Sequence, residues 1–330
     1  MSIPEYDVAI LMPQTTDHER TAIRYAGLFD ELAAHAVSAC MAHGLASYNA
    51  ETHTFPGVTN VRHDVIADAA ASRVVRDLTM PKDPANADLY NDRYGPILVH
   101  HPALNYYLTD KSNIARALPQ FHPETRVAAA ADILDAVSAI PGERVVIKPV
   151  TGSRSKGVQL LPKTALSNSQ FNSGNYLVQE YIDTSAGIPE FDIKGTHNVR
   201  ILSIGSKVVG ALARVNGSNK DMLQNDVYGS YVPADDLPDT MHAAADAVHT
   251  ELRRLSGHGA NIIAIDMMRG RGASGEQIDV ICEVNRRPQR ISRYDTVGKQ
   301  AGQNLDEAGL LELARLWDRE EAVLLAGQLG

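Results

Sequence analysis

The order of hydrophobic and polar positions predicts an α/β arrangement in the first hundred residues. Val8–Met12 is a short apolar run of the kind that forms a buried strand. A helical pattern follows, with Asp17 as its expected N-cap and an expected end near His43. The stretch 51–95 is harder to interpret and is rich in loop-forming residues in its second part, and Ile97–Val99 is a further candidate strand. A strand followed by a helix favours an α/β domain.

The rest of the chain changes from helices to a pattern that strands dominate. Helices are expected at Thr109–Leu118, Ala128–Ala139, Asp239–Leu255 and Leu305–Gly327. Strands rich in Val, Ile and Leu are expected at Val145–Val150, Val158–Leu161, Tyr176–Ile182, Val199–Ile204, Lys207–Val215, Asn261–Met268 and Gln277–Val284. The dipeptide Gly205-Ser206 separates two of these strands and predicts a tight hairpin turn.

Length and charge narrow the class of protein. A chain of 330 residues is longer than one compact core usually covers, so two or three packed subdomains are expected. The formal net charge of -9 argues against broad binding of nucleic acid or anionic membranes. Cys40 and Cys282 have no metal-ligand spacing, and the sequence shows no secretory segment and no apolar run of about 18 residues. We therefore expect a cytoplasmic protein without nucleic-acid or membrane partners; its oligomeric state stays open, a homo-oligomer included.

The first candidate for chemistry is a lysine followed by a loop of small residues. Lys148 ends a predicted strand, and Gly152, Ser153, Ser155 and Gly157 lie in the connection to the next strand. Small residues let backbone N–H groups approach an anion, and a lysine is a mobile positive charge suited to phosphate. This is not a Walker loop, because its pattern and its following helix are absent. The alternative is an ordinary hairpin tip beside a surface lysine.

A second candidate is the strand Tyr176–Ile182, in which polar residues interrupt an apolar run. An edge of this strand, together with the Glu180 side chain, would suit an adenine or ribose. Taken alone, the pattern is better explained by a half-buried strand with a polar outer face.

Two acidic residues and an asparagine form the sharpest pattern. Asp266 lies in one apolar strand, and Glu283 and Asn285 end the next one, two residues apart and therefore on one face. Carboxylate and amide oxygens are hard ligands suited to Mg²⁺, which usually shares its shell with phosphates and water. The alternative is that these acids pair with arginines.

Two other patterns argue against a dinucleotide-binding loop and against a zinc site. Gly270–Gly275 matches G-x-G-x-x-G in its letters, but it lies between two predicted strands and is expected to be a hairpin connection. The twelve histidines show no H-E-x-x-H or comparable spacing, which argues against a zinc enzyme.

In chain order, these pieces resemble the ATP-grasp superfamily, especially its ribosomal-protein glutamate ligases, glutathione synthetases and peptide-forming amino acid ligases. The resemblance covers roughly residues 109–289. It implies an α/β (α+β) fold in which ATP is held between two lobes that contain β-sheets. The implied domains are an N-terminal α/β domain at 1–108, linker helices and a small lobe at 109–184, and a C-terminal lobe at 185–330. The residues it places near ATP are Lys111, Lys148, Gly152, Ser153, Ser155, Lys156, Gly157, Gln179, Glu180, Tyr181 and Ile182.

The same resemblance assigns roles on the later strands. Arg200 and Arg214 match arginines near the acyl phosphate or γ-phosphate, and with Lys148 they are the implied catalytic residues. Asp266, Glu283 and Asn285 match the family's metal ligands. The family's usual aspartate is Asn198 here. Asn225 and Gly229 resemble a following loop. After the metal ligands this chain continues with Arg286-Arg287-Pro288-Gln289 instead of a small residue, proline and glycine, so its handling of substrate is expected to differ.

The implied activity is an ATP- and Mg²⁺-dependent ligase that activates a carboxylate as an acyl phosphate and joins it to an amine. A small amino acid or peptide is the expected substrate, and at least one of Arg286, Arg287, Arg290 and Arg293 is expected to bind a substrate carboxylate. Two other activities stay open. One is a kinase that stops after phosphoryl transfer. The other is a nucleotide-binding regulatory protein without turnover.

Overall fold

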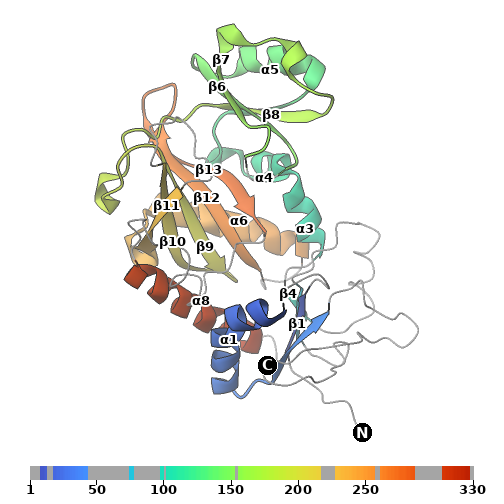
Figure 1. Cartoon of the computed structure of the whole chain (residues 1–330). Helices are drawn as coiled ribbons and strands as arrows, with labels where there is room; N and C mark the ends of the chain where they lie inside the picture. Colours follow the sequence, from blue (N-terminus) through green and yellow to red (C-terminus); the bar gives the residue numbers. More distant parts are fainter. Residues whose placement is uncertain are drawn as a thin grey trace, which may run out of the picture.

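The computed structural model describes residues 8–12, 18–43, 74–77, 97–99, 102–152, 155–216, 227–256, 261–286 and 307–327. Three sheets organise these residues, one near the N-terminus, a small antiparallel sheet and a large antiparallel sheet. In Figure 1 the small sheet lies at the top, the large sheet in the middle and the N-terminal sheet at the bottom.

The N-terminal sheet has four strands in the order β2-β1-β3-β4, all paired in parallel. Its strands are β1 (Val8–Met12), β2 (Ala39–His43), β3 (Val74–Asp77) and β4 (Ile97–Val99). The predicted strands at β1 and β4 are confirmed. Strand β3 lies in the first part of the stretch 51–95, for which no prediction was made from the sequence.

The helix expected to reach His43 is wrong in its last third, after Ala34. Helix α1 (His18–Ala34) ends where Ala36 adopts the left-handed conformation, with a φ of 56°, and Val37 N–H donates to the Leu32 carbonyl at 2.9 Å. The following residues form β2 beside β1. Alanine-rich sequence favours a helix locally, but pairing with β1 decides the outcome. The expected cap Asp17 lies outside the described residues.

The small sheet has the order β5-β8-β6-β7 and is antiparallel throughout. Its elements are β5 (Thr125–Ala129), α5 (Ile133–Ala139), β6 (Arg144–Pro149), β7 (Gln159–Pro162) and β8 (Asn175–Glu180). The helix expected at Ala128–Ala139 is therefore too long, because Ala128 and Ala129 pair with β8 and a 3-10 turn precedes α5. Helix α5 packs against the sheet through Ile133 and Val137.

The large sheet has the order β11-β10-β9-β12-β13 and is also antiparallel. Its strands are β9 (His197–Ile204), β10 (Lys207–Asn216), β11 (Val227–Pro233), β12 (Ile262–Arg271) and β13 (Gln277–Asn285). The Gly205-Ser206 hairpin is confirmed, since Lys207 pairs with Ile204. Strand β11 has no counterpart in the sequence predictions.

Helices cover both faces of the large sheet. Helix α6 (Asp239–Ser256) packs on one face against Val199, Ile201 and neighbouring apolar residues. Helices α1 and α8 (Glu307–Gly327) pack on part of the other face through a core that contains Trp317. Figure 1 shows α8 below the sheet and next to α1.

A short helical connection joins the N-terminal sheet to the small sheet. It contains α3 (Pro102–Thr109), which was not predicted, and α4 (Lys111–Ala117). Helix α4 was predicted, and Asp110 caps it by accepting the Ser112 N–H at 2.8 Å. Figure 1 shows α4 between the small and large sheets.

The loop that matches G-x-G-x-x-G is a hairpin connection, as expected. It joins the antiparallel strands β12 and β13, where Arg271 pairs with Gln277. The hairpin also contacts the chain that leaves the small sheet. Asp183 and Arg271 exchange two backbone hydrogen bonds of 2.9 Å, and Gly270 lies so close to Asp183 that a Cβ would sit 2.5 Å from its carbonyl oxygen.

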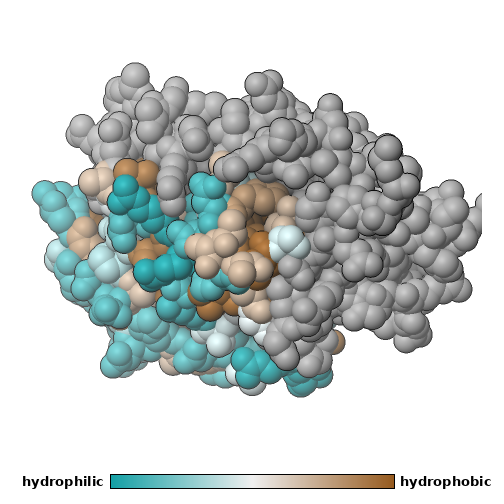
Figure 2. Space-filling view, turned by 90° about the horizontal axis from the view of Figure 1, so that it is seen from below, coloured by the Kyte–Doolittle hydropathy of each residue, from teal (hydrophilic) through white to brown (hydrophobic). Residues whose placement is uncertain are grey.

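The face seen from below is of mixed polarity. Hydrophilic residues cover much of its coloured part, and the largest group of hydrophobic residues lies beside the grey atoms (Figure 2). None of the described helices combines the length and the apolar character that crossing a membrane requires.

Candidate functional site

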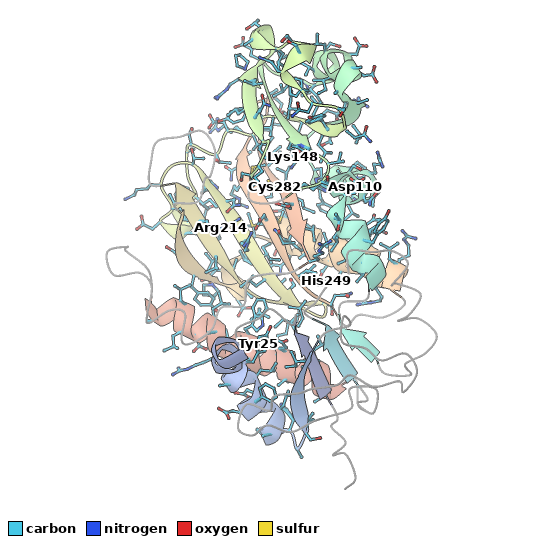
Figure 3. All side chains as sticks on the ribbon, turned by 45° about the vertical axis from the view of Figure 1, so that its right-hand side comes forward. Tyr25, Asp110, Lys148, Arg214, His249 and Cys282 are labelled. Carbon is cyan, nitrogen blue, oxygen red and sulfur yellow. The ribbon has the colours of Figure 1, made fainter. Side chains whose placement is uncertain are left out.

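A pocket lies where the small sheet, α4 and the large sheet meet. Its apolar lining comes from Leu108, Ile114, Ala115, Leu177 and Val284, and its polar lining from Asp110, Lys111, His122, Lys148, Gln179, Cys282 and Glu283. Figure 3 shows Lys148 and Cys282 side by side at this junction, with Asp110 close to them. Small-molecule sites commonly combine an apolar lining with a few converging polar groups.

Lys148 enters the pocket from the small sheet. It lies near the end of β6, is only 6% exposed, and its Nζ donates to the Cys282 carbonyl of β13 at 2.9 Å. An ammonium group has three N–H donors, so this contact leaves donors for an anion. The alternative of an ordinary surface lysine is excluded by this burial.

Lys111 links three elements at the pocket. It is the first residue of α4, and its Nζ donates to the Gly152 carbonyl at 2.5 Å and lies 3.5 Å from Glu283 Oε1. Helix α4, the glycine-rich loop and β13 therefore meet at one positive charge.

The glycine-rich loop is exposed and uses unusual backbone conformations. The φ angles of Gly152, Ser155 and Gly157 are 130°, 54° and 76°. Gly157 packs closely on Pro149, where a Cβ would lie 3.0 Å from Cγ. Lys156 is exposed at the tip, and Ser153 lies outside the described residues. A loop with few packed side chains can change its conformation at low cost.

The side chains of the Gln179–Ile182 segment contact other protein groups. Gln179 Nε2 donates to Thr125 Oγ1 at 2.8 Å, and Glu180 Oε1 accepts from the Ala273 N–H of the β12–β13 hairpin at 2.6 Å. The Tyr181 ring lies under the Arg144 guanidinium, 4.5 Å away, and Ile182 is buried. Nucleotide binding by this segment therefore stays a prediction. Its backbone N–H and C=O groups, more than its side chains, would contact the nucleotide.

One face of the large sheet carries a charged cluster. Asn198 and Arg200 are two apart on β9 and share a face; Arg214 lies opposite Asn198 on β10, and Asp266 lies opposite Arg200 on β12. Glu283 on β13 lies opposite Asp266. Further along this face, Leu202, Ile204, Ile262 and Ala264 pack under α1 and α8. Among the described residues, this face is thus apolar where α1 and α8 cover it and charged beyond them.

Asp266 is held by two arginines. Arg200 donates to both carboxylate oxygens, from Nε at 2.7 Å and Nη2 at 2.8 Å, and Arg214 Nη2 lies 3.0 Å from Oδ1. Asn285 Nδ2 adds a bond of 3.0 Å to Oδ2. Burial opposes ionisation of Asp266, but the hydrogen bonds and charges of the arginines hold its carboxyl pKa below the usual value.

The positive charges of Arg200 and Arg214 are stabilised to different extents by their neighbours. Burial disfavours the charged form of both guanidinium groups. The bidentate pairing with Asp266 nevertheless raises the pKa of Arg200 above its usual value. For Arg214 burial lowers the pKa, Asp266 only partly offsets this, and Arg200 repels it. Arg214 Nε donates to Asn198 Oδ1 at 2.8 Å, a neutral acceptor.

The metal ligands expected from the sequence lie together. Asp266, Glu283 and Asn285 are neighbours on β12 and β13, and their oxygens suit Mg²⁺. Nowhere in the described chain do three His, Cys, Asp or Glu side chains converge as a metal site, so a cation here would need Asn285 and a substrate's phosphates as well. Asp266 already accepts four donors, so it would have to exchange arginine contacts for the cation. The ligand types fit, and the assignment stays a prediction.

The arginines after β13 are only partly described. Arg286 donates to Thr109 Oγ1 at the end of α3. Arg287, Arg290 and Arg293 lie outside the described residues, as does Asn225. Gly229 lies on β11 opposite Arg214.

Sequence reasoning missed His122 in the pocket lining. Within the described chain neither of its ring nitrogens has a hydrogen-bond partner. Burial, and to a smaller extent the charge of Lys148, lowers its pKa to about 4. The residue lies in a short turn before Pro123, where neither hydrophobic periodicity nor a motif marks it.

Comparisons with known proteins agree with this architecture. The model of the RimK-like ATP-grasp domain matches residues 118–307. No curated protein sequence matches the chain. Among solved structures, D-alanine–D-alanine ligase from Bacillus anthracis complexed with ATP is 12% identical, with a TM-score of 0.55 and coverage of 98% of this chain and 100% of that one.

Two further solved structures match at the same level. D-cycloserine synthetase DcsG is 16% identical, with a TM-score of 0.52 over 98% of this chain and 99% of that one. A RimK domain ATP-grasp protein from Sphaerobacter thermophilus is 19% identical, with a TM-score of 0.52 over 93% and 98%. At these identities the structures establish the fold, and the domain match covers more than half of the sequence. The chain belongs to the RimK-like ATP-grasp family, whose members are ATP-dependent ligases with the α/β fold expected from the sequence.

Proposed function

We propose that this protein is an ATP- and Mg²⁺-dependent ligase that joins a carboxylate to an amine through an acyl phosphate, releasing ADP and phosphate. Family membership supports ATP-dependent ligation in general. The carboxylate–amine chemistry, the acyl phosphate and the residue roles rest on the site itself.

The observation that carries the proposal is the charge balance beside the pocket. Two guanidinium groups, Arg200 and Arg214, share the single carboxylate of Asp266. Glu283, the neighbour of Asp266 on β13, lines the pocket together with Lys111 and Lys148. Cations therefore extend from the pocket onto the charged part of the large sheet's face. Such an arrangement suits a triphosphate and a negatively charged transition state.

Each side chain has a role in this scheme. Lys148 would bind a phosphate oxygen from the small sheet, and Arg200 and Arg214 would stabilise the transferred phosphoryl group from the large sheet. Asp266, Glu283 and Asn285 would hold magnesium, which when bound supplies charge against the phosphate oxygens. The Gly152–Gly157 loop would cover the phosphates and keep water from the acyl phosphate. Lys111 would couple this loop to Glu283, since it contacts both.

The proposed substrates are a small amino acid or peptide as carboxylate and as amine. The named ligases with the same fold include D-alanine–D-alanine ligase and D-cycloserine synthetase. A related structure, the ATP-grasp ligase PsnB, was obtained in complex with a minimal precursor, Mg and ADP.

The test is mass spectrometry of the purified protein incubated with ATP, Mg²⁺ and pooled amino acids and short peptides. The proposal expects ADP and a product whose mass equals two substrates less one water. AMP and pyrophosphate would overturn the acyl-phosphate route. ADP with a phosphorylated product and no amide would establish a kinase instead. Nucleotide binding without turnover over the whole panel would favour a regulatory role.

A further inference from the structure

The β12–β13 hairpin carries a G-x-G-x-x-G sequence that the candidate site leaves unexplained. A Cβ on Gly270 would lie 2.5 Å from the carbonyl oxygen of Asp183, and a Cβ on Gly272 would lie 2.7 Å from Oε1 of Glu180. The third glycine, Gly275, has a φ of 80° and open space around its ideal Cβ position. The first two glycines are therefore explained by close contact with the chain that leaves the small sheet, and the third by its backbone conformation.

The hairpin holds that chain at two points. Asp183 and Arg271 exchange two backbone hydrogen bonds of 2.9 Å. The Glu180 side chain reaches across to the turn, where its Oε1 accepts from the Ala273 N–H at 2.6 Å. A hydrogen bond from a backbone N–H to a carboxylate is charge-assisted, and it is stronger than one between neutral groups. Both ends of the stretch from Glu180 to Asp183 are therefore fixed by one hairpin of the large sheet.

The fixed stretch is continuous with the pocket. Gln179 directly precedes Glu180, lines the pocket, and donates from Nε2 to Thr125 Oγ1 at 2.8 Å. Leu177, two residues earlier on β8, also lines the pocket and pairs with Lys148 of β6. Displacing Glu180 would therefore displace its neighbour Gln179 and the end of β8 that lines the pocket.

Protein groups contact both oxygens of the Glu180 carboxylate. Besides the Ala273 N–H at Oε1, the Glu124 N–H lies 3.5 Å from Oε2. We propose that Glu180 is a positioning residue, whose carboxylate holds the Gln179–Ile182 segment against the β12–β13 hairpin so that the backbone of the segment can bind the nucleotide. This inference rests on the proposed function. It differs from direct contact between the Glu180 side chain and adenine or ribose.

The main experiment removes the hydrogen-bond donor and leaves Glu180 in place. The Gly275 N–H donates to the Gly272 carbonyl at 3.0 Å, so Ala273 is the second residue of a β-turn, and its φ is not positive. Proline is favoured at this position of a type I turn, so Ala273→Pro should keep the turn and remove the N–H. We expect calorimetry in Mg²⁺ to show about fivefold weaker binding of ADP, because the hydrogen bond to the carboxylate is lost.

A second variant and a control accompany it. Gly272→Ala places a methyl group against Glu180 Oε1 at a position where φ is not positive, and we expect the same loss of ADP affinity. It keeps the test intact if Ala273→Pro does not fold. Ser274→Ala is the matched control in the same turn. The Ser274 hydroxyl accepts only from the Glu276 N–H of the hairpin, at 3.4 Å, so this variant should bind ADP like the wild type.

A double-mutant cycle separates positioning from direct contact. If Glu180 acts through the Ala273 N–H, the variant with both Glu180→Ala and Ala273→Pro should bind ADP about fivefold more weakly than the wild type, like each single variant. Independent effects would multiply to about 25-fold and would overturn the proposal. Weaker binding in Glu180→Ala alone, with wild-type affinity in Ala273→Pro and Gly272→Ala, would assign Glu180 to direct contact with the nucleotide instead.

The remaining outcomes keep this inference apart from the proposed function. A hairpin that only stabilises the fold would lower the urea midpoint of Ala273→Pro and Gly272→Ala and leave their ADP affinity unchanged. That result overturns the role of Glu180 and leaves the proposed function in place. A wild-type protein that binds no ADP overturns the proposed function, and the inference with it.

Discussion

Two charged clusters on the same pair of strands show different balances. In the first, Arg200 and Arg214 share Asp266, next to Glu283. In the second, a single cation, Arg269, binds both oxygens of Asp279 at 2.8 Å and reaches Glu190 at 2.8 Å through Nη1. Both clusters use β12 and β13. The first has two cations for one directly bound carboxylate, and the second has two carboxylates for one cation.

The ratio of cations to carboxylates in a cluster, more than the presence of ion pairs, therefore distinguishes a candidate site from a structural contact. Asp279 also accepts from Thr240 on α6, so the Arg269 cluster ties the hairpin to its neighbours and leaves no net positive charge. In the Asp266 cluster, two guanidinium groups contact one carboxylate, which is the arrangement that the proposed function uses. Burying a charge without full compensation costs stability, and a protein commonly accepts this cost at functional sites.

The largest expected effect is on the metal ligands. Glu283→Gln should lower kcat by about 10³-fold, because it removes a carboxylate proposed to hold magnesium. It should leave the fold intact, since the ion pair with Lys111 is long, at 3.5 Å. ADP release and far-UV circular dichroism check the two parts. Turnover within about threefold of the wild type would refute the metal assignment.

In the Arg269 cluster, a substitution should lower stability and leave kcat unchanged, in contrast to Glu283→Gln. Arg269→Gln leaves the buried Asp279 without its bidentate partner, and we expect the free energy of unfolding to fall by about 3 kcal/mol. Its kcat per folded molecule should be unchanged. Urea denaturation and the ADP-release assay measure these quantities. A loss of kcat without a loss of stability would mean that the comparison of the two clusters is wrong.

The arginines of the site come next. Arg200→Gln and Arg214→Gln should each lower kcat by about 10²-fold, the usual scale for one group that stabilises developing charge. Arg254→Gln is the control, since Arg254 forms an exposed bidentate pair with Glu251 outside both clusters. Equal kinetics for all three variants would contradict a role for the cationic excess.

The smallest expected effect is a pH dependence of the free energy of unfolding, caused by a histidine outside the candidate site. Burial lowers the pKa of His249, on α6, to about 4, whereas the unfolded chain protonates it near 6.5. The unfolded state therefore binds more protons between these values, so stability is full above about pH 6.5 and falls as the pH drops toward 4. We expect a loss of about 2 kcal/mol between pH 8 and pH 5. His249→Leu should flatten this dependence; an unchanged urea-midpoint profile would exclude His249 as its source.

Some features of this protein follow from the sequence alone. The strands of the large sheet other than β11 can be predicted from their apolar runs of Val, Ile and Leu. Such runs are typical of strands that are packed against other elements on both faces. The order of Lys148, the glycine loop, Arg200, Arg214, Asp266 and Glu283-x-Asn285 identified the family, since each residue lies on or beside a strand with a clear pattern.

Other features were decided only by tertiary structure. The alanine-rich segments at β2 and β5 favour helices locally, and only pairing with β1 and β8 makes them strands. The partners of Asp266 could not be predicted, because the nearby arginines in sequence follow β13 while Arg200 and Arg214 arrive from β9 and β10. Sequence spacing tells which side chains share the face of one strand. Strand order and register determine which charges meet across a sheet, and these depend on packing of the whole chain.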